Sequence, residues 1–491
     1  MILRPHQNLA IEMLRSSLRH GNKRVILAAP CSFGKTITAL HMLQSAAEKG
    51  KRGIFICDRI KLVQQALESA DFHGLDVGVI QGAHERSNWD APIQIASIQT
   101  LARRSRMVEF DFAIVDECHV HYKALDAYMK AYDNVPFIGL SATPYAKGLG
   151  NVYQDIVVPI TPRQLLDRDF LCPVDYYGGH TVNLKGIARR AIPTGGTDYD
   201  PKALSRAMED DTKLVGDIVQ NWLKHAEGRQ TIAFSPSIKH SKHMVEMFEA
   251  HGITACHIDG YMDDEERQWI FKAHDAGEFK ILSCSRLLNT GYDAPNVSCL
   301  IDCFPTSSII SYVQRAGRIM RTAEGKDKAI YLDHAGNVSR HGFAEDIIPE
   351  SLDAGEKRFN EKNQVREKKE TKSKTCPQCY QIMVGIRCKC GYEIPIKEQI
   401  VSDKQELKKL KSVSKEDKAR WYGEFVLYAA TKGYKPGYAS HLYRQKFGVW
   451  PKVQPDRAVV MSQDVLGFIQ HTFIKRAKGA LNDRNGVRKT G

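Results

Sequence analysis

Short apolar runs alternate with longer mixed segments along the first third of the chain. Five of these runs read "RVILAAP", "GIFICD", "IQIAS", "FAIVDE" and "PFIGLSA". Each is separated from the next by a segment of helical character or a loop. Strands that alternate with helices in this way are typical of a parallel sheet with helices on both faces. The pattern therefore predicts an N-terminal α/β domain.

The alternation pauses at a stretch rich in glycine, proline and polar residues, "ARRAIPTGGTDYDPKAL". It then restarts with the runs "QTIAFS", "ITACHI", "FKILSC", "SCLIDC" and "KAIYLD". We therefore expect a second α/β domain in tandem with the first. From Glu356 to Lys374 the sequence becomes charged, which is typical of a solvated helix or a linker.

Length and composition fit a globular protein of several domains. The chain has 491 residues, of which 43% are hydrophobic and 9% aromatic, and one domain per roughly 150 residues suggests about three. No stretch approaches the ~20 apolar residues that a membrane helix needs. The first residues, "MILRPHQNLA", lack the features of a secretory signal. We expect a cytoplasmic protein without a membrane partner, in the host cytoplasm if a phage encodes it.

Positive charge is concentrated at the C-terminal end. Residues 351–491 hold 30 Lys and Arg against 15 Asp and Glu, whereas the preceding residues hold 40 against 42. A basic tail on a neutral body suggests a polyanionic partner, nucleic acid first. A charged tail that only increases solubility is the alternative.

The segment "APCSFGKT", Ala29 to Thr36, follows the expected strand "RVILA" and precedes a helical stretch. This is the context of a phosphate-binding loop, in which backbone N–H groups at a helix N-terminus surround phosphates. Lys35 would contact the terminal phosphates, Thr36 could hold Mg²⁺, and Gly34 allows close approach of the backbone. Ala29 is compatible with the loop entry, but Ser32 departs from the glycine of many such loops. A chance Gly-Lys-Thr on a surface turn is the alternative.

A second motif follows the run "FAIV", which ends at Asp116-Glu117-Cys118-His119. Open parallel sheets bind ligands at the carboxyl ends of their strands, so these carboxylates can face the same phosphates as Lys35. We expect Asp116 to hold Mg²⁺ through water and Glu117 to orient or deprotonate the attacking water. Adjacent acids at a strand end are also common turn formers, but the phosphate-loop motif favours the catalytic interpretation.

Together these motifs resemble the superfamily 2 helicases of the "DExH" type, over about residues 1–345. The segment "LRPHQ" resembles the Q motif of that family, with Arg4 in it and Gln7 in the position that reads the adenine edge, which implies ATP. The segments "DRIKLVQQ" and "IASIQTL" resemble motifs that grip the nucleic-acid backbone, which implies such contacts for Arg59, Gln65 and Thr100. "SAT", Ser141 to Thr143, resembles the element that couples hydrolysis to strand movement.

The resemblance extends through the second domain. "LLNTGYDAP" is similar to motif V, which implies that Thr290 and Gly291 contact strand or nucleotide and Asp293 the ribose. "QRAGRIMR" is similar to motif VI, which implies that Gln314 lies near His119. The same motif implies that Arg318 and Arg321 are arginine fingers on the γ-phosphate. ATP binding would then favour closure of two RecA-like domains, and hydrolysis would permit opening.

Four cysteines crowd together in "CPQCYQIMVGIRCKCGYE", whereas the other eight are scattered, mostly within apolar runs. Four thiolates suit a tetrahedral structural Zn²⁺, although the last pair is one residue closer than in the usual knuckle. Ordinary reduced thiols are the alternative, and a cytosolic location argues against disulfides. The proposed zinc ligands are Cys376, Cys379, Cys388 and Cys390.

The next segment, "RWYGEFVLYAATKGYKPGYASHLYRQKFGVWP", mixes cations with aromatic residues. Such aromatics can stack on bases, or they can form the core of a small helical module with the cations outside. Together with the cysteine cluster this segment resembles the C-termini of RadD-like bacterial helicases and their phage-encoded relatives.

The expected architecture is therefore two tandem RecA-like α/β domains with parallel sheets, followed by a zinc knuckle and a basic, mainly helical module that binds nucleic acid. The resemblance implies an ATP-dependent DNA helicase or translocase in replication, recombination or repair. Its partners would be single-stranded or branched DNA, with single-strand-binding or recombination proteins as further candidates. The alternatives are an RNA helicase and a scaffold whose ATP site only gates nucleic-acid binding. The expected limits are 1–158 and 159–350 for the two domains, 351–374 for a linker, 375–395 for the knuckle and 396–491 for the C-terminal module.

Overall fold

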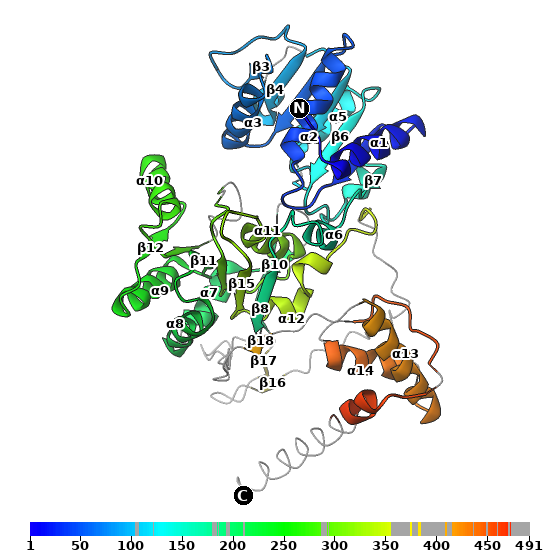
Figure 1. The fold of residues 1–491 in the computed structure, drawn as a ribbon, viewed down its shortest axis with the longest axis vertical. Helices are drawn as coiled ribbons and strands as arrows, with labels where there is room; N and C mark the ends of the chain where they lie inside the picture. Colours follow the sequence, from blue (N-terminus) through cyan, green and yellow to red (C-terminus); the bar gives the residue numbers. More distant parts are fainter. Residues whose placement is uncertain are drawn as a thin grey trace, which may run out of the picture. The chain divides into compact units, whose positions relative to one another are not determined.

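The fold of the chain is known from a computed structural model (Figure 1). It describes residues 1–103, 108–120, 122–178, 184, 186–192, 197–209, 212–285, 292, 294–354, 374–375, 382–383, 408–409, 415–435, 437–447, 450–458, 460–469 and 472. The chain divides into two compact units. The first comprises Met1–Ile160, Val182–Thr212 and Pro349–Asp403, and the second Thr161–Thr181, Lys213–Ile348 and Lys404–Gly491.

The first unit is built on a seven-stranded sheet of order β3-β4-β2-β5-β6-β1-β7. Every pairing in it is parallel. The four central strands are almost completely buried, because their apolar runs face helices on both sides of the sheet. The strands are β1 (Arg24–Ala28), β2 (Gly53–Cys57), β3 (Gly78–Ile80), β4 (Ile93–Ser97), β5 (Phe112–Val115), β6 (Phe137–Ser141) and β7 (Asp155–Val157).

Helices connect these strands and pack against them. Helix α1 contacts β1 and β7, α2 contacts β2, and α3 contacts β4. Pro5 at the first turn of α1 has the fixed φ that suits a helix start. The helices are α1 (Pro5–Arg19), α2 (Lys35–Ala47), α3 (Ile60–Phe72), α4 (Ile98–Arg103) and α5 (Lys123–Ala131), with the 3-10 turn η1 (Leu149–Asn151). The hairpin β9 (Arg189–Ala191) and β10 (Thr197–Tyr199) belongs to the same unit. Helix α7 (Pro201–Glu209) and the short pair β16 (Lys374–Thr375) and β17 (Ile382–Met383) belong to it as well.

The second unit contains another seven-stranded sheet, of order β12-β13-β11-β14-β15-β8-β18. Its pairings are parallel except that of β18, which is antiparallel to β8. The two units thus share the α/β architecture of tandem RecA-like helicase domains. The strands are β8 (Val174–Gly178), β11 (Thr231–Phe234), β12 (Ala255–Ile258), β13 (Ile281–Cys284), β14 (Cys299–Asp302), β15 (Ala329–Asp333) and β18 (Lys408–Lys409).

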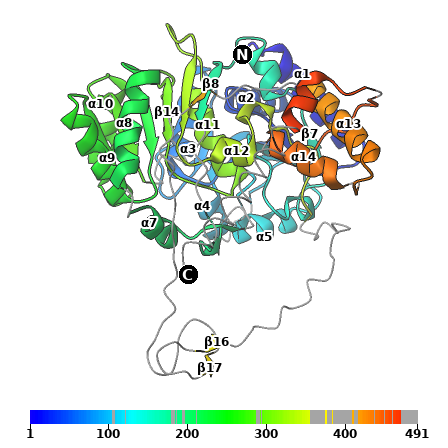
Figure 2. The same cartoon turned by 90° about the horizontal axis from the view of Figure 1, so that it is seen from below.

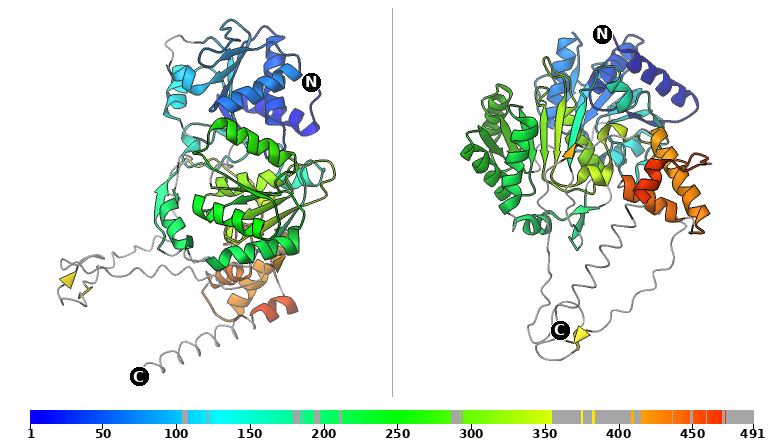
Figure 3. Two further views of the ribbon diagram at one scale, coloured as in Figure 1. Left: turned by 90° about the vertical axis from the view of Figure 1, so that its left-hand side faces the viewer. Right: turned by 60° about the horizontal axis from the view of Figure 1, so that its bottom comes forward.

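The helices of the second unit lie beside its strands, as the green elements of Figure 3 show. Helix α9 packs on β12 and β13, and α11 packs on β14 and β15. Helix α11 has a side-chain cap at its start, where Ser308 Oγ accepts the N–H of Ser311. The helices are α6 (Pro162–Leu166), α8 (Thr212–Ala226), α9 (Ile238–Ala250), α10 (Asp264–Asp275), α11 (Ile309–Ile319) and α12 (Asn337–His341), with the 3-10 turn η3 (Ala344–Asp346).

Two C-terminal helices, α13 (Lys415–Thr431) and α14 (Gly437–Phe447), pack side by side (Figure 2). Their shared core holds Trp421, Phe425, Tyr428, Leu442 and Tyr443, with Val465 and Ile469 from a following helical turn. Four of the nine aromatics between residues 420 and 451 are buried in this core, and Tyr422, Tyr438 and Phe447 are partly buried against it. Trp450 and Tyr434 remain 45% and 41% exposed.

Candidate functional site

The predicted phosphate loop lies between β1 and α2. Gly34 caps α2 with φ 87°, a left-handed conformation that glycine adopts without strain. Ser32 also has a positive φ, 61°, so a residue with a side chain occupies a conformation that favours glycine. The loop entry is attached to the sheet, because Ala29 N–H donates to Ser141 O at 2.9 Å.

Polar side chains at the start of α1 form hydrogen bonds with the backbone of this loop. The Gln7 side chain is 3% exposed, and its Nε2 donates to Phe33 O at 3.1 Å and to Gly34 O at 3.3 Å. Its Oε1 accepts the Arg4 N–H at 2.8 Å. His6 Nε2 lies 3.3 Å from the same Phe33 oxygen, and Arg4 Nη1 donates to Ser32 O at 3.4 Å. Both amide atoms of Gln7 thus contact the chain itself, and the role of Gln7 toward adenine stays a prediction.

Lys35 and the two carboxylates after β5 come together at the carboxyl edge of the first sheet. Lys35 Nζ lies 3.5 Å from Glu117 Oε1. Burial alone lowers the pKa of Lys35, but the negative charges of Glu117 and Asp116 raise it above its usual value. Burial first, and then the Glu117 charge, raises the pKa of Asp116 to about 7. Asp116 and Glu117 are thus suited to bind a cation, since a positive charge there would relieve the unfavourable burial of two adjacent carboxylates.

Ser141 links the two motifs from the strand that lies between them. Strand β6 pairs with both β1 and β5, so its last residue, Ser141, lies between the phosphate loop and the carboxylates. Ser141 Oγ is 2.9 Å from His119 Nδ1 and accepts the Thr143 N–H at 3.0 Å. His119 Nδ1 also lies 3.2 Å from Glu117 Oε2. The "DECH" and "SAT" segments therefore form one buried network.

In the first unit, residues predicted to contact nucleic acid come directly after two neighbouring strands. Arg59 caps α3 just after β2, and Thr100 lies in α4 just after β4, while Cys57 of β2 pairs with Ser97 of β4. Arg59 is exposed, and Thr100 Oγ1 accepts the Gly82 N–H at 3.2 Å. Gln65 is half-buried on α3.

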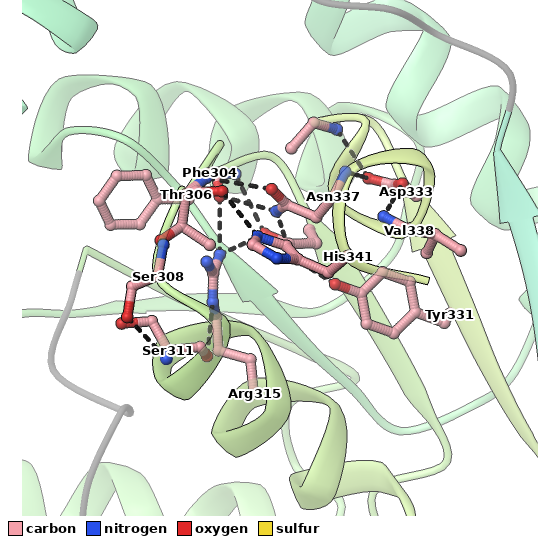
Figure 4. Close-up of polar contacts among 12 residues, drawn as sticks. Phe304, Thr306, Ser308, Ser311, Arg315, Tyr331, Asp333, Asn337, Val338 and His341 are labelled. Carbon is pink, nitrogen blue, oxygen red and sulfur yellow. Dashed lines mark hydrogen bonds and ion pairs between the residues drawn. The ribbon is translucent and has the colours of Figure 1, made fainter. Parts of the chain in front are cut away.

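Helix α11 carries Arg318, and Arg321 follows two residues after the end of the helix. Buried polar contacts hold this helix in place (Figure 4). Arg315, one residue after Gln314, donates from Nη1 to Asp302 Oδ1 at 2.5 Å and to Phe304 O at 2.8 Å. Asn337 Nδ2 donates to the other Asp302 oxygen at 2.8 Å and to Phe304 O at 3.0 Å. Arg315 thus anchors the helix to the end of β14.

The finger residues themselves are half-buried, as is Gln314. Arg318 Nη1 donates to the carbonyl oxygen of Tyr292, within the predicted motif V. Lys326 Nζ donates to Arg321 O and Val297 O, both at 2.7 Å, and to Pro295 O at 3.0 Å. The backbone after motif V and the end of motif VI are therefore held together by one ammonium group.

Several predicted site residues lie outside the described part of the chain. These are the motif V residues Thr290, Gly291 and Asp293 and the zinc ligands Cys376, Cys379, Cys388 and Cys390. Among the residues that are described, no group of three or more His, Cys, Asp or Glu side chains is arranged to hold a metal ion. No helix in the described ranges is long and apolar enough to cross a membrane.

The motifs assign no role to the residues that support the site without lining it. Arg315 and Asp302 were not singled out, although an arginine among the apolar positions of a helix and an aspartate closing a buried strand were both visible. His6 was overlooked beside Gln7. The pairing of Tyr122 with Asp58, whose atoms lie 2.8 Å apart, also had no signal beyond the position of Asp58 at a strand end.

Comparisons with known proteins agree with this geometry. Residues 1–146 match the family "Type III restriction enzyme, res subunit", and residues 213–323 match "Helicase conserved C-terminal domain". A 51.5 kDa protein of a Lactococcus phage is 27% identical over 385 residues, 76% of this chain and 79% of its own length. IRC3 of Saccharomyces cerevisiae, named as an ATP-dependent helicase, is 25% identical over 69% of this chain, which spans about half (52%) of the yeast protein.

Among solved structures, a fragment described as an HsdR subunit of a type I restriction enzyme from Vibrio vulnificus shares the fold. Its TM-score is 0.54 at 19% identity, over 72% of this chain and 67% of that one. The two family matches cover both parallel-sheet units in the order that the motifs require, and the relatives include a named ATP-dependent helicase. The chain belongs to the superfamily 2 helicases and is an ATP-hydrolysing enzyme.

Proposed function

We propose that the chain is a DNA helicase or translocase that hydrolyses Mg²⁺-ATP between Lys35 and Glu117. The observation that carries this proposal is the approach of Lys35 Nζ to within 3.5 Å of Glu117 Oε1 at the start of α2. Lysine and a carboxylate so placed can serve the two ends of one reaction, the phosphate and the attacking water.

The residues around this pair fit a magnesium nucleotide. Asp116 Oδ1 is buried and has no hydrogen-bond partner among the described residues, and Thr36 is half-buried in the first turn of α2. We assign the ion to Thr36 and, through water, to Asp116. An ion held there would supply positive charge that neutralises the charge developing on the phosphates. Lys35 and the backbone of Ser32 to Thr36 would bind the phosphates, and Glu117 would take the proton of the attacking water.

The second unit would supply the guanidinium groups. Arg318 and Arg321 would stabilise the γ-phosphate, an effect that is worth roughly 10³- to 10⁵-fold in rate for arginine fingers. Arg315, which is anchored to Asp302, fixes the position of α11, on which Gln314 and Arg318 share one face at a spacing of four residues. Arg321 follows two residues after the end of this helix.

We assign DNA as the nucleic acid on which the enzyme acts, on the basis of the C-terminal region. Residues 351–491 carry the excess positive charge of the chain, and they resemble the C-termini of RadD-like helicases. With Trp421, Phe425, Tyr428 and Tyr443 buried in the helical core, the cations would contact phosphates, and exposed Trp450 would stack on a base. The context of replication, recombination or repair, and a Zn²⁺ ion on the four clustered cysteines, belong to the same proposal.

Hydrolysis tests the site directly. Lys35→Ala and Glu117→Gln should each abolish ATP turnover. The matched controls Lys51→Ala and Glu109→Gln remove exposed side chains of the same unit, 61% and 91% exposed, and should leave turnover intact. Unchanged turnover in either site variant would refute the assignment.

The choice of track is tested separately, by titrating ATP turnover with single-stranded DNA, duplex DNA and RNA at one salt concentration. Stimulation by DNA supports the proposal. Stronger stimulation by RNA would identify an RNA helicase instead. Tight DNA binding without strand displacement or translocation would identify a scaffold.

A further inference from the structure

Asp58 lies where three functional segments of the first unit meet. It directly follows β2, whose Ile56 pairs with Val115 of β5 and whose Cys57 pairs with Ser97 of β4. The segment that begins with Asp116 thus lies on one side of Asp58, and the segment of Thr100 on the other. Asp58 is only 8% exposed, so its carboxylate depends on protein groups rather than water for its polar contacts.

The contact toward the ATP site is made by Tyr122. Tyr122 Oη donates to Asp58 Oδ2 at 2.8 Å. Tyr122 caps α5 five residues after Glu117, and between them Val120 N–H donates to Glu117 O at 3.0 Å in a tight turn. Glu117 has φ 46°, a conformation that leaves a residue with a side chain little freedom. Glu117 and Tyr122 are thus only five residues apart in the sequence, and a backbone hydrogen bond holds the turn that begins at Glu117.

Asp58 also contacts the two segments that are proposed to bind nucleic acid. Asp58 Oδ2 lies 3.5 Å from Nε of Arg59, which begins α3. The Asp58 carbonyl oxygen accepts Gln99 Nε2 at 2.5 Å, and Gln99 Oε1 in turn accepts the Ser97 hydroxyl at 2.7 Å. Gln99 precedes Thr100. Asp58 therefore contacts both segments that carry the proposed phosphate-gripping residues.

We propose that the Tyr122–Asp58 hydrogen bond couples nucleotide binding to nucleic-acid binding in the first unit. The proposal rests on the proposed function, since it takes Glu117 as the nucleotide end and Arg59 and Thr100 as the nucleic-acid end. Tyr122 and Asp58 are positioning residues, because neither touches the reacting atoms. A hydrogen bond to an ionised carboxylate is short and directional, so it transmits a shift of the turn better than an apolar contact does.

Coupling of this kind is reciprocal, which gives a test that a merely structural role would not pass. If nucleotide raises the affinity for DNA by some factor, DNA must raise the affinity for nucleotide by the same factor, and such factors are typically about 5 to 150. The experiment measures the Kd of a single-stranded DNA oligonucleotide with and without a non-hydrolysable ATP analogue and Mg²⁺. It then measures the Kd of the analogue with and without the oligonucleotide.

The full-length chain is compared with Tyr122→Phe, Asp58→Ala and the double variant. Tyr132→Phe is the matched control, because Tyr132 Oη also donates one hydrogen bond in this unit, to Val108 O at 2.8 Å, at neither proposed binding site. Tyr122→Phe should lower the coupling factor about 5-fold or more. If the wild-type factor is itself below about 5, the variant should show no coupling, that is, a factor of one. Each ligand alone should bind within about 2-fold of the wild type. The double variant should lose no more than Asp58→Ala alone, because Asp58→Ala already removes the one contact that Tyr122→Phe removes.

A wild-type coupling factor in Tyr122→Phe would overturn the proposal, as would an equal loss in Tyr132→Phe. Failure of the proposed function looks different, because the wild-type chain would then bind no analogue or no oligonucleotide. If Asp58→Ala does not fold, Tyr122→Phe still decides the question, since it removes only one hydroxyl group.

Discussion

The guanidinium group of Arg315 donates to the Asp302 carboxylate at 2.5 Å, and the two side chains are 1% and 0% exposed. Phe304 and Phe234 flank the guanidinium, at 5.3 and 5.6 Å from their ring centroids. A buried ion pair gains little net stability, because both charges lose water. The ion pair matters for geometry, since it fixes the helix that bears Arg318 and that ends two residues before Arg321.

Removal of one partner should be more harmful than removal of both. Arg315→Ala leaves Asp302 buried and charged, and should cost about 3 to 5 kcal/mol of unfolding free energy. The double variant Arg315→Met, Asp302→Leu should recover only part of that loss, because Asp302→Leu also removes the acceptor of Asn337 Nδ2 and Tyr331 Oη. Chemical unfolding measures both. Arg267→Ala is the control, because its partner Asp264 is 89% exposed and such pairs contribute about 1 kcal/mol or less. A double variant as unstable as Arg315→Ala would contradict this account.

Gly34 should tolerate no side chain. At φ 87° an alanine is strained, and its Cβ would meet Gln7 Nε2. We expect Gly34→Ala to lose nucleotide binding, measured by titration with a fluorescent ATP analogue. Gly50→Ala is the control, since Gly50 has φ 72° but no atom within 4 Å of the added Cβ. It should cost about 1 kcal/mol in stability and leave nucleotide binding unchanged. Equal effects of the two changes would show that Gln7 sets no limit on Gly34.

Ser32→Gly should stabilise the first unit. A left-handed conformation costs a non-glycine residue about 1 to 2 kcal/mol, and the substitution removes this cost. Part of the gain is lost again, because glycine has more conformational entropy in the unfolded chain. The expected net gain is about 0.5 to 1 kcal/mol, which calorimetry would detect as a higher unfolding temperature. Asp169, with φ 58° in the second unit, is the comparison, since Asp tolerates this region better and Asp169→Gly should gain less. A lower unfolding temperature for Ser32→Gly would refute the prediction.

His240 should make the second unit sensitive to acid. It is 6% exposed on α9, and burial first, then the charge of His243, lowers its pKa to about 4. The unfolded chain binds the proton more readily, so stability is intact above about pH 6.5 and is lost as the pH falls toward 4. The full loss is about 3 kcal/mol. His240→Leu should flatten this dependence in unfolding experiments between pH 4 and 7. The exposed His251→Leu should not, and an unchanged slope in His240→Leu would refute the assignment.

The apolar runs predicted the central strands because burial on both faces leaves a continuous hydrophobic signature. All ten runs contain a strand of the two sheets. The strands β3 and β7 had no such signature, since three residues are too few for any period. Strand β8 was hidden because Asp175 and two tyrosines interrupt its apolar pattern.

The site was predictable where chemistry and strand ends coincide. Lys35 and Glu117 follow separate strands, and parallel strands end at one edge of the sheet, so their meeting followed from the motifs. The pairs Asp302 with Arg315 and Asp58 with Tyr122 were not predictable. The contact of Tyr122 depends on which strands are neighbours, and β2 lies beside β5 only through the strand order of the complete sheet.

The hydrogen bonds of Gln7 have a consequence for protein engineering. One amide holds Phe33 O and Gly34 O through its nitrogen and Arg4 N–H through its oxygen. A substitution chosen to change base preference, from adenine to guanine for instance, would also release the peptide groups that shape the cradle for the phosphates. The predicted adenine contact of Gln7 would therefore place base selectivity and the shape of the phosphate loop on one side chain, and a redesign of the first would require new hydrogen bonds to hold the second.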